Sequence, residues 1–313
     1  MEILKGKPVS EAVEGEIRER LIPLYEQNIA PTLAIVRVGN NPGDIAYENG
    51  AIKKAKSVGV QAEKFTCPED MEEEDVISVI QSLNENAGIH GILLLQPLPA
   101  KFDGDRIRNA ISPEKDVDCT SDASLARFFV RGEGFCPCTA ESAMEILKHY
   151  GVEISGRRAV VIGRSMVIGR PAALMLMREN ATVTVCHSKT PADTLRQACR
   201  EADIIVTAAG KIDAVTEDMM TEKQVIVDVG INFDSDGKMC GDADFEAAER
   251  ICRAATPVPG GVGSVTTAIL MRHLVAAAER QFRRGETSGK DFLHPIQEDR
   301  SNEDLLLFKM LHM

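Results

Sequence analysis

Short runs of apolar, mostly β-branched residues alternate along the chain with segments in which apolar residues recur at helical spacing. The runs are continuous and do not alternate regularly with polar residues, which is typical of parallel strands covered on both faces. We therefore predict strands at residues 32–38, 91–95, 159–162, 181–186, 203–207 and 224–229.

The segments between these runs predict helices. Residues 10–27 include Pro23, where a helix would bend, and residues 264–283 form a longer helix after the last glycine-rich loop. In the tail, Ser301 and Asp304 resemble a capping box that opens an apolar turn at residues 301–313. The other predicted helices are 44–58, 72–87, 139–150, 169–179 and 190–201. Strands followed by helices in this rhythm indicate α/β domains with parallel sheets.

The length of the chain predicts two such domains. It has 313 residues, of which 44% are hydrophobic and 27% charged, whereas one domain usually has about 150 residues. A boundary is expected near residues 120–150, because residues 131–138 are rich in glycine, proline and cysteine and a predicted helix follows them.

Charge and composition exclude several classes of partner. The net charge of -12 would repel a phosphate backbone, so nucleic acid is not expected to bind. No apolar run is long enough for a membrane span, and the first residues lack the apolar core of a signal peptide, so we expect a cytoplasmic protein. The tightest cysteine pair, Cys136 and Cys138, is spaced too closely for a zinc motif, so no metal is expected.

A strand, a turn and a helix at residues 159–179 predict a phosphate-binding site. Gly163 permits a tight turn, Gly169 permits close packing of helix on strand, and amides at the helix start would face a pyrophosphate. The turn departs from the GxGxxG fingerprint, since Ser165 replaces the middle glycine and the spacing is longer. The alternative is a purely structural turn.

The end of the following strand indicates which dinucleotide would bind. An acid at this point would bind the ribose hydroxyls of NAD, but the first acid here is Asp193. Arg164, Ser188 and Lys189 are instead donors suited to a 2′-phosphate, which favours NADP over NAD. Lys189 could equally be a solvated loop lysine, and His187 a residue without a ligand role.

Other loops at predicted strand ends complete the candidate site. Residues 256–263 hold two prolines and three glycines, which fix one backbone path and allow close approach to a ligand. Polar or proline-rich residues follow the strands in segments 38–47 and 91–99, and segment 113–118 supplies acids. Ligand sites of α/β proteins form at such strand ends. The residues alone thus predict an NADP-dependent oxidoreductase with its substrate domain in front.

Taken in order, these motifs resemble the methylenetetrahydrofolate dehydrogenase/methenyltetrahydrofolate cyclohydrolase family over roughly residues 1–285. The residues that carry the resemblance are Tyr47, Gln96-Pro-Leu-Pro99, Lys115-Asp-Val-Asp118, Pro137-Cys-Thr139, Gly163-Arg-Ser165, Cys186-His-Ser188, Val227-Asp-Val-Gly-Ile-Asn232 and Thr256-Pro-Val-Pro-Gly-Gly-Val-Gly263.

The resemblance implies a fold, an activity and an assembly. A folate substrate domain would comprise residues 1–138 plus 268–313, and a Rossmann-like NAD(P)-binding domain with a parallel sheet would comprise residues 139–267. The protein would oxidise 5,10-methylenetetrahydrofolate to 5,10-methenyltetrahydrofolate with NADP, in one-carbon metabolism, and would form a homodimer.

The resemblance also assigns roles by position. Tyr47 and Asp118 would be catalytic, with Tyr47 against the folate and Asp118 on the pterin ring, although the residues alone also allow a buried tyrosine and a loop cap. The further substrate-binding residues would be Leu95, Gln96, Pro97, Pro259 and Gly260. The cofactor phosphates would lie at Gly163, Arg164, Ser165 and Ser188, and the nicotinamide at Ile231.

Several positions depart from the family pattern. Ala51 stands where the family has a lysine, four residues after the tyrosine, and Leu95 stands where it has a glutamine, with Gln96 displaced by one. Asp44 replaces a serine on the same helix. Outside that group, the family's usual glycine and proline are replaced by Cys119 and Ser264.

Three interpretations follow from these departures. The first is a dehydrogenase whose cyclohydrolase activity is weak or lost, because the lysine serves hydrolysis. The second is a fully bifunctional enzyme in which another group, with Lys54 as the candidate, replaces the lysine from the same helix face. The third is a folate- or nucleotide-binding protein without catalysis, against which the intact cofactor motifs argue.

Overall fold

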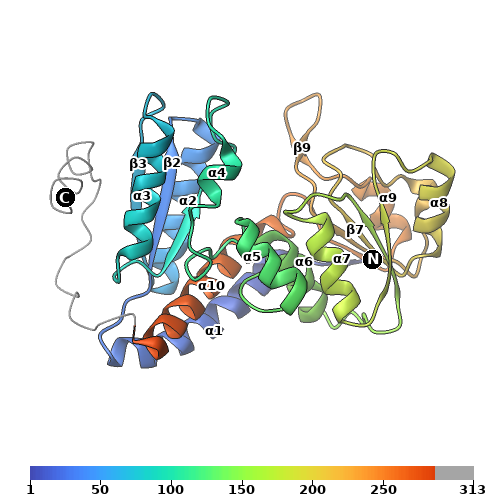
Figure 1. The fold of residues 1–313 in the computed structure, drawn as a ribbon. Helices are drawn as coiled ribbons and strands as arrows, with labels where there is room; N and C mark the ends of the chain where they lie inside the picture. The colour runs from blue at the N-terminus through green and yellow to red at the C-terminus, as the bar shows by residue number, and fades with distance from the viewer. Residues whose placement is uncertain (286–313) are drawn as a thin grey trace. The chain divides into compact units, whose positions relative to one another are not determined.

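The computed structural model describes residues 1–285 and divides the chain into two compact units (Figure 1). The first unit contains Met1–Val13 and Cys136–Ile269, and the second contains Glu14–Phe135 and the described chain from Leu270 onward. Helices α1 (Gly6–Glu26) and α10 (Gly263–Arg284) each contribute residues to both. The predicted helix at 301–313 lies outside the described residues.

The first unit is built on a six-stranded parallel sheet in the order β1-β11-β8-β7-β5-β6. The chain runs from β5 outward to β6 and then returns to β7 on the other side of β5. This reversal is the topological switch point at which doubly wound sheets bind ligands. The strands are β1 (Glu2–Ile3), β5 (Arg158–Ile162), β6 (Thr182–Cys186), β7 (Ile204–Thr207), β8 (Val225–Asp228) and β11 (Ala254–Ala255).

Strand β1 lies in the large sheet of the first unit, and the expected domain bounds stay a prediction. Residues 1–138 were expected to belong entirely to the substrate domain, but Met1–Val13 group with the first unit. The physical reason is that Glu2 and Ile3 continue the large sheet by pairing in parallel with β11.

Helices cover both faces of this sheet, as its buried apolar strands require. Figure 1 shows α6 (Cys138–His149) and α7 (Gly169–Arg178) on one side and α8 (Ala192–Glu201) and α9 (Phe245–Ile251) on the other. Beneath α8, α9 and the short 3₁₀ helix η2 (Glu217–Met219) lies a core that includes Val160, Ile162, Ile205 and Ile226. A hairpin of β9 (Asn232–Phe233) and β10 (Met239–Cys240) follows β8.

The second unit is built on a smaller parallel sheet in the order β3-β2-β4. Its strands are β2 (Thr32–Val38), β3 (Gln61–Cys67) and β4 (Gly91–Leu94), and every residue of the central β2 is buried. Its other helices are α2 (Pro42–Val58), α3 (Glu73–Glu85), α4 (Gly104–Arg108), α5 (Asp122–Ala126) and the π-helix η1 (Arg127–Arg131). The prediction of two α/β units with parallel sheets is confirmed. Within residues 1–285, none of the helices combines the length and apolarity that crossing a bilayer requires.

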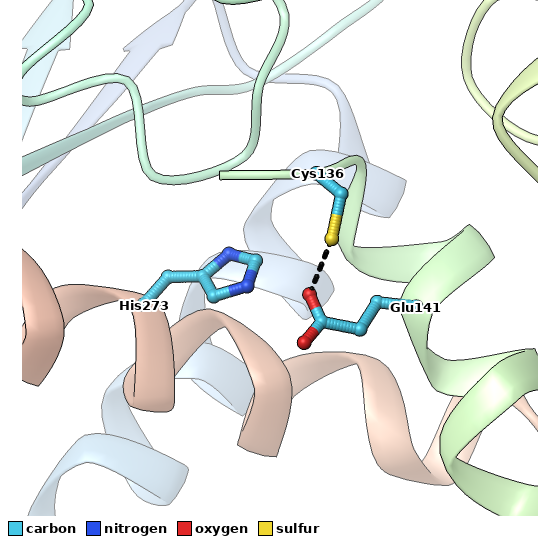
Figure 2. A group of neighbouring side chains, drawn as sticks. All are labelled: Cys136, Glu141 and His273. Atoms are coloured by element: carbon cyan, nitrogen blue, oxygen red, sulfur yellow. Dashed lines mark hydrogen bonds between the residues drawn. The ribbon is translucent and has the colours of Figure 1, made fainter. Parts of the chain in front are cut away.

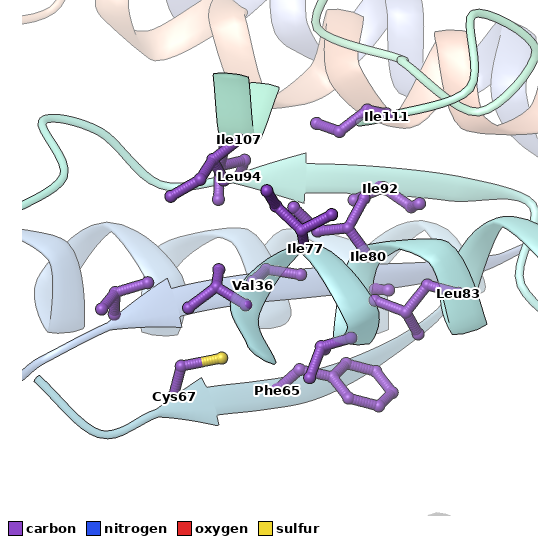
Figure 3. Packing of buried hydrophobic residues seen from close by; sticks show 14 of the residues in the cluster. Val36, Phe65, Cys67, Ile77, Ile80, Leu83, Ile92, Leu94, Ile107 and Ile111 are labelled. Atoms are coloured by element: carbon purple, nitrogen blue, oxygen red, sulfur yellow. The ribbon is translucent and has the colours of Figure 1, made fainter. Parts of the chain in front are cut away.

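Helix α3 closes one face of the small sheet, and we expect its core to be sensitive to truncation. Ile80 of α3 is fully buried against this face. It packs in one core with Val36 of β2, Phe65 of β3 and Ile92 of β4 (Figure 3). Ile80→Ala should lower the free energy of unfolding by about 2–5 kcal/mol, because it leaves a cavity in a close-packed core. Urea unfolding measures this, with the exposed Gln81→Ala as the control, and an equal effect of both substitutions would contradict the assignment.

A buried histidine in this unit predicts a loss of stability in acid. His90 Nδ1 accepts a hydrogen bond from the amide of Thr32 at 3.1 Å, and burial, assisted by the charge of Lys115, lowers the pKa of His90 from 6.5 to about 4. The unfolded chain binds a proton near pH 6.5 but the folded protein does not, so the free energy of unfolding should fall as the pH is lowered from 6.5 to 4. The expected loss is about 3 kcal/mol.

The measurement compares urea unfolding at several pH values in the wild type and in His90→Asn, which keeps an acceptor for Thr32 but has no titrating group. The variant should lose less stability in this window. The exposed His149→Gln is the control. Equal pH dependence in all three proteins would contradict the prediction.

Candidate functional site

The expected cofactor residues all follow strands of the large parallel sheet. Gly163, Arg164 and Ser165 come after β5, Ser188 after β6 and Ile231 after β8. The expected substrate residues Pro259 and Gly260 come after β11 of the same sheet. Because every pairing in the sheet is parallel, these segments leave the sheet at one edge.

The turn after β5 is packed too closely for side chains at its two glycines. Gly163 has a φ of 130°, and a Cβ there would lie 2.3 Å from the carbonyl oxygen of Ala208, which follows β7. A Cβ on Gly169 would lie 2.3 Å from the carbonyl oxygen of Gly163. The glycines therefore allow the turn, the start of α7 and the end of β7 to meet at the switch point.

Ser165 binds backbone amides at the start of α7. These amides were expected to be free to bind a pyrophosphate. Ser165 Oγ accepts hydrogen bonds from the amides of Ile168 at 3.2 Å and Gly169 at 3.5 Å, and its carbonyl oxygen accepts one from Arg170 at 3.0 Å. The serine thus uses these donors because the loop folds back on itself, while the Arg164 side chain is exposed.

Arg164 and Ser188 occupy equivalent positions on neighbouring strands. Ile162 of β5 and Cys186 of β6 are partners in the sheet, and the amide of Gly163 donates to the carbonyl of Cys186 at 2.9 Å. Arg164 and Ser188 each follow two residues after these partners. Both side chains are exposed. Two exposed donors thus follow neighbouring strands at the same edge of the sheet, where they could hold an anionic group.

The neighbouring polar residues have other partners. His187 Nδ1 accepts a hydrogen bond from the amide of Lys189 at 3.1 Å, which holds the loop, while Lys189 itself is exposed. Asp193 forms an ion pair with Arg196 at 2.7 Å on α8. The first acid after β6 is therefore engaged on its own helix and not directed to a ribose.

Two buried acids, Asp228 and Asp242, organise the segments near Ile231, and sequence reasoning assigned neither of them a role. Asp228 ends β8 and accepts hydrogen bonds from the amides of Gly230 at 2.9 Å and Ala243 at 2.8 Å. Its pKa is raised to about 6, chiefly by burial and further by the charge of Asp242, although these amides oppose the shift. An acid that directly follows an apolar strand is the signal that could have identified Asp228.

The proline- and glycine-rich loop after β11 is anchored at both ends. Thr256 Oγ1 accepts a hydrogen bond from the amide of Asp228 at 2.7 Å, and the carbonyl of Gly260 accepts one from the amide of Gly6 at 2.8 Å. Ser264, where the family has proline, donates to the carbonyl of Gly261 at 2.7 Å. Pro259 and Gly260 are exposed between these anchors.

In the second unit, the expected folate residues lie at the carboxyl edge of the small sheet. Tyr47 is on α2 after β2, and the segment Leu95–Pro97 follows β4. Asp118 stands two residues beyond Asp116, which forms a parallel bridge with Ile92 of β4. Tyr47 is 40% exposed, so it is not a buried core tyrosine.

The residues after β4 differ in exposure. Leu95 is buried and its amide donates to the carbonyl of Val36 at 2.9 Å, whereas Gln96 and Pro97 are exposed and joined by a cis peptide bond. Gln96 and Pro97 are therefore accessible at the surface of the unit, whereas Leu95 is not. The substrate-binding roles of all three stay predictions.

The loop that carries Asp118 is held by its neighbours. Lys115 is buried and donates to the carbonyls of Leu83 at 3.0 Å and Asn86 at 2.7 Å, at the end of α3. Asp116 is fully buried and accepts hydrogen bonds from Thr120 and Ser121. These fixed neighbours leave Asp118 half-buried and in a defined position.

Cys119, where the family has glycine, adopts a φ of 55° and is buried. Burial raises the pKa of its thiol, and the charges of Asp116 and Asp118 raise it further. These surroundings favour the neutral thiol over the nucleophilic thiolate.

The helix face beyond Tyr47 shows what occupies the place of the family's lysine. Ala51, one turn along α2, is fully buried. Lys54 Nζ is paired with Glu14 Oε1 on α1 at 2.5 Å, and Glu14 also pairs with Arg18 at 3.1 Å. The candidate substitute for the lysine thus has a carboxylate partner on a neighbouring helix.

Cys136 lies just before α6 and donates a hydrogen bond from Sγ to Glu141 Oε2 at 2.7 Å (Figure 2). His273, on α10, places Nδ1 2.8 Å from the carbonyl oxygen of Val117 and stacks its ring near Phe135. The cysteines among residues 1–285 are free thiols. That the protein needs no metal stays a prediction.

The chain matches two family models that correspond to its two halves. Residues 4–118 match the catalytic domain of tetrahydrofolate dehydrogenase/cyclohydrolase, and residues 137–282 match the NAD(P)-binding domain of the same family. The resemblance drawn from the motifs is thereby confirmed.

Relatives and solved structures agree with these matches. The chain is 48% identical over 281 residues to the Bifunctional protein FolD of Carboxydothermus hydrogenoformans, covering 89% of this chain and 97% of that protein. The structure of the bifunctional FolD enzyme from Campylobacter jejuni superimposes with a TM-score of 0.87 at 36% identity, covering 90% of this chain and 99% of that one. The corresponding enzyme from Trypanosoma brucei, solved with NADP and an inhibitor, has a TM-score of 0.84 at 32% identity, covering 90% and 98%. This chain belongs to the tetrahydrofolate dehydrogenase/cyclohydrolase family.

Proposed function

We propose that this protein oxidises 5,10-methylenetetrahydrofolate to 5,10-methenyltetrahydrofolate with NADP as the hydride acceptor, as a step of one-carbon metabolism. The observation that carries the proposal is the gathering of the cofactor residues at one edge of the large sheet, around the switch point between β5 and β7. The names of the relatives give the reaction. Residues Tyr47, Gln96 and Asp118 of the second unit, with Pro259 and Gly260, are proposed to hold the folate.

Oxidation requires this chain mainly to position its ligands. Hydride leaves a carbon flanked by two nitrogens, whose lone pairs stabilise the resulting cation, so no side chain has to transfer a proton. The protein must align the reacting groups and tolerate positive charge. Appearance of NADPH absorbance on mixing methylenetetrahydrofolate, NADP and protein tests the proposal, and its failure to appear would favour the non-catalytic binding protein.

Preference for NADP is supported by the exposed donors that follow β5 and β6. Arg164 and Ser188 are exposed donors, and Asp193 is engaged with Arg196, so the ribose end is suited to a 2′-phosphate. The related enzyme from Trypanosoma brucei was solved with NADP.

We predict that Arg164→Ala raises the KM for NADP about tenfold or more and changes the KM for NAD less than about twofold. The substitution removes a charge-assisted hydrogen bond that only a 2′-phosphate can accept. Steady-state assays with both cofactors measure this, with the exposed Arg178→Ala at the far end of α7 as the control. Equal changes for both cofactors, or a wild type that prefers NAD, would contradict NADP specificity.

We also propose that the second activity of the family, hydrolysis of methenyltetrahydrofolate, is weak in this protein. Ala51 in place of lysine and the ion pair of Lys54 with Glu14 support it. The relatives named as bifunctional give it no support, and the fully bifunctional alternative rests on them. The homodimer and the cytoplasmic location stay predictions.

A further inference from the structure

Asp242 is a buried carboxylate that ties the end of β7 to the segment after β8. It is fully buried and accepts hydrogen bonds from the successive amides of Ala209 at 2.6 Å, Gly210 at 3.2 Å and Lys211 at 3.0 Å. Thr207 Oγ1 donates to it at 3.1 Å. Such a set of donors stabilises the carboxylate and holds the loop after β7 in one conformation.

Asn232 connects this carboxylate to the hairpin that follows β8. Its Nδ2 donates to Asp242 Oδ1 at 2.9 Å and to the carbonyl of Gly241 at 3.0 Å. A Cβ on Gly230 would lie 2.2 Å from the carboxyl group of Asp242, so the backbone before Asn232 also packs directly against the acid. Asp242 thus fixes the start of the hairpin through Asn232 and through the backbone at Gly230.

The residues on either side of Asn232 form an apolar pair that faces away from this anchor. Side chains alternate along an extended segment, so Ile231 and Phe233 lie on the face opposite to Asn232. They are 61% and 62% exposed, whereas Asn232 is half-buried. A rigid anchor below two exposed apolar side chains indicates a surface that a planar apolar group would cover.

The topology of the sheet suggests which part of a dinucleotide would meet this pair. Arg164 and Ser188, the proposed 2′-phosphate residues, follow β5 and β6 on one side of the switch point, and β8 lies on the other side. A dinucleotide binds across the switch point, so its second half would lie at the ends of β7 and β8. These are the two strand ends that Asp242 ties together.

We infer that Asp242 and Asn232 are positioning residues that hold Ile231 and Phe233 against the nicotinamide ring of the cofactor. The inference rests on the proposed NADP-dependent oxidation and adds a role for Asp242, Asn232 and Phe233. The apolar pair contacts the ring, and the acid and the amide act through it by fixing the backbone.

The test separates the two halves of the cofactor by using two probes, NADPH and adenosine 2′,5′-bisphosphate, which lacks the nicotinamide. Asn232→Ala and Phe233→Ala should each raise the Kd for NADPH about fivefold to tenfold, the scale of one lost contact, and change the Kd for the bisphosphate less than about twofold. Phe233→Leu, which keeps an apolar side chain, should recover most of the affinity. Ser235→Ala, exposed in the same hairpin, is the control and should change neither value.

Other outcomes would overturn the inference. Equal loss of affinity for both probes would show that Asn232 merely stabilises the unit, and unchanged NADPH binding in Phe233→Ala would show that this side chain does not meet the nicotinamide. Because Phe233 is exposed, its variants should fold even if those of Asn232 do not. A wild type that binds neither probe would refute the proposed function itself, whereas tight binding with unaffected variants refutes the inference alone.

Discussion

Asp118→Ala should lower kcat/KM for the oxidation of methylenetetrahydrofolate about a hundredfold or more. The carboxylate of Asp118 is proposed to accept hydrogen bonds from the amino and ring N–H groups of the pterin. Its negative charge would also stabilise the cationic product, and loss of one such preorganised contact has an effect of about this size. Asp118→Asn should be nearly as damaging, because an amide keeps the shape but neither the charge nor the paired acceptor oxygens.

The surroundings of Asp118 provide the control for this prediction. The loop is held by Lys115 and Asp116, which the substitution does not touch, so thermal unfolding of Asp118→Ala should resemble that of the wild type. Asp122→Ala removes an exposed acid that begins α5, four residues further along the chain, and should leave kcat/KM unchanged. Near-normal activity of Asp118→Ala would show that the pterin is held elsewhere.

The strands that sequence reasoning identified are the mostly apolar, β-branched runs. The central strand β2, at Thr32–Val38, was predicted from such a run, and the structure confirms it as a fully buried strand. Strand β3, at Gln61–Cys67, was not predicted, because polar residues interrupt its apolar ones. Edge position alone is not the reason, since β4 and β6 are also edge strands and were predicted from their apolar runs. A strand with a mixed sequence is specified by pairing with its neighbour, which a local pattern does not reveal.

The same distinction applies to the candidate site. Gly163 and Gly169 were recognisable because close backbone approach demands glycine, and the structure shows such approach at both. Asp242 was not recognisable, since its partners Ala209 and Asn232 lie in segments after β7 and β8 that come together only once these strands have paired. Residues that act through long-range hydrogen bonds leave no spacing in the sequence to detect.

Hydrolysis of methenyltetrahydrofolate by this protein should be at least about a hundredfold slower than its oxidation of methylenetetrahydrofolate. The two reactions need different groups. Oxidation depends on alignment, as argued above, which the proposed cofactor residues at the edge of the large sheet would provide. Hydrolysis requires water to attack the methenyl cation and lose a proton, after which the ring opens with protonation of a nitrogen. A group of tuned pKa must therefore lie within hydrogen-bond reach, and its loss costs about 10²–10⁴ in rate.

The structure does not supply an obvious replacement on α2. Ala51 has no group that can exchange a proton, and Leu95, where the family has an amide side chain, is buried and apolar. Lys54 is seven residues after Tyr47, so its Cα lies about 10 Å further along the helix axis, and its Nζ is paired with Glu14. To serve in hydrolysis, Lys54 would have to leave that carboxylate and reach back along the helix.

The decisive measurement follows the absorbance of methenyltetrahydrofolate with and without protein, above its spontaneous hydrolysis, beside the oxidation rate of the same preparation. Lys54→Met should change neither rate by more than about twofold, and the exposed neighbour Lys53→Met is its control. Hydrolysis at a rate comparable to oxidation would contradict the proposed weak activity and favour the bifunctional enzyme that the relatives' names suggest. If Lys54→Met then abolished hydrolysis while Lys53→Met did not, Lys54 would be the group that replaces the family's lysine, and its ion pair with Glu14 would have to open during turnover.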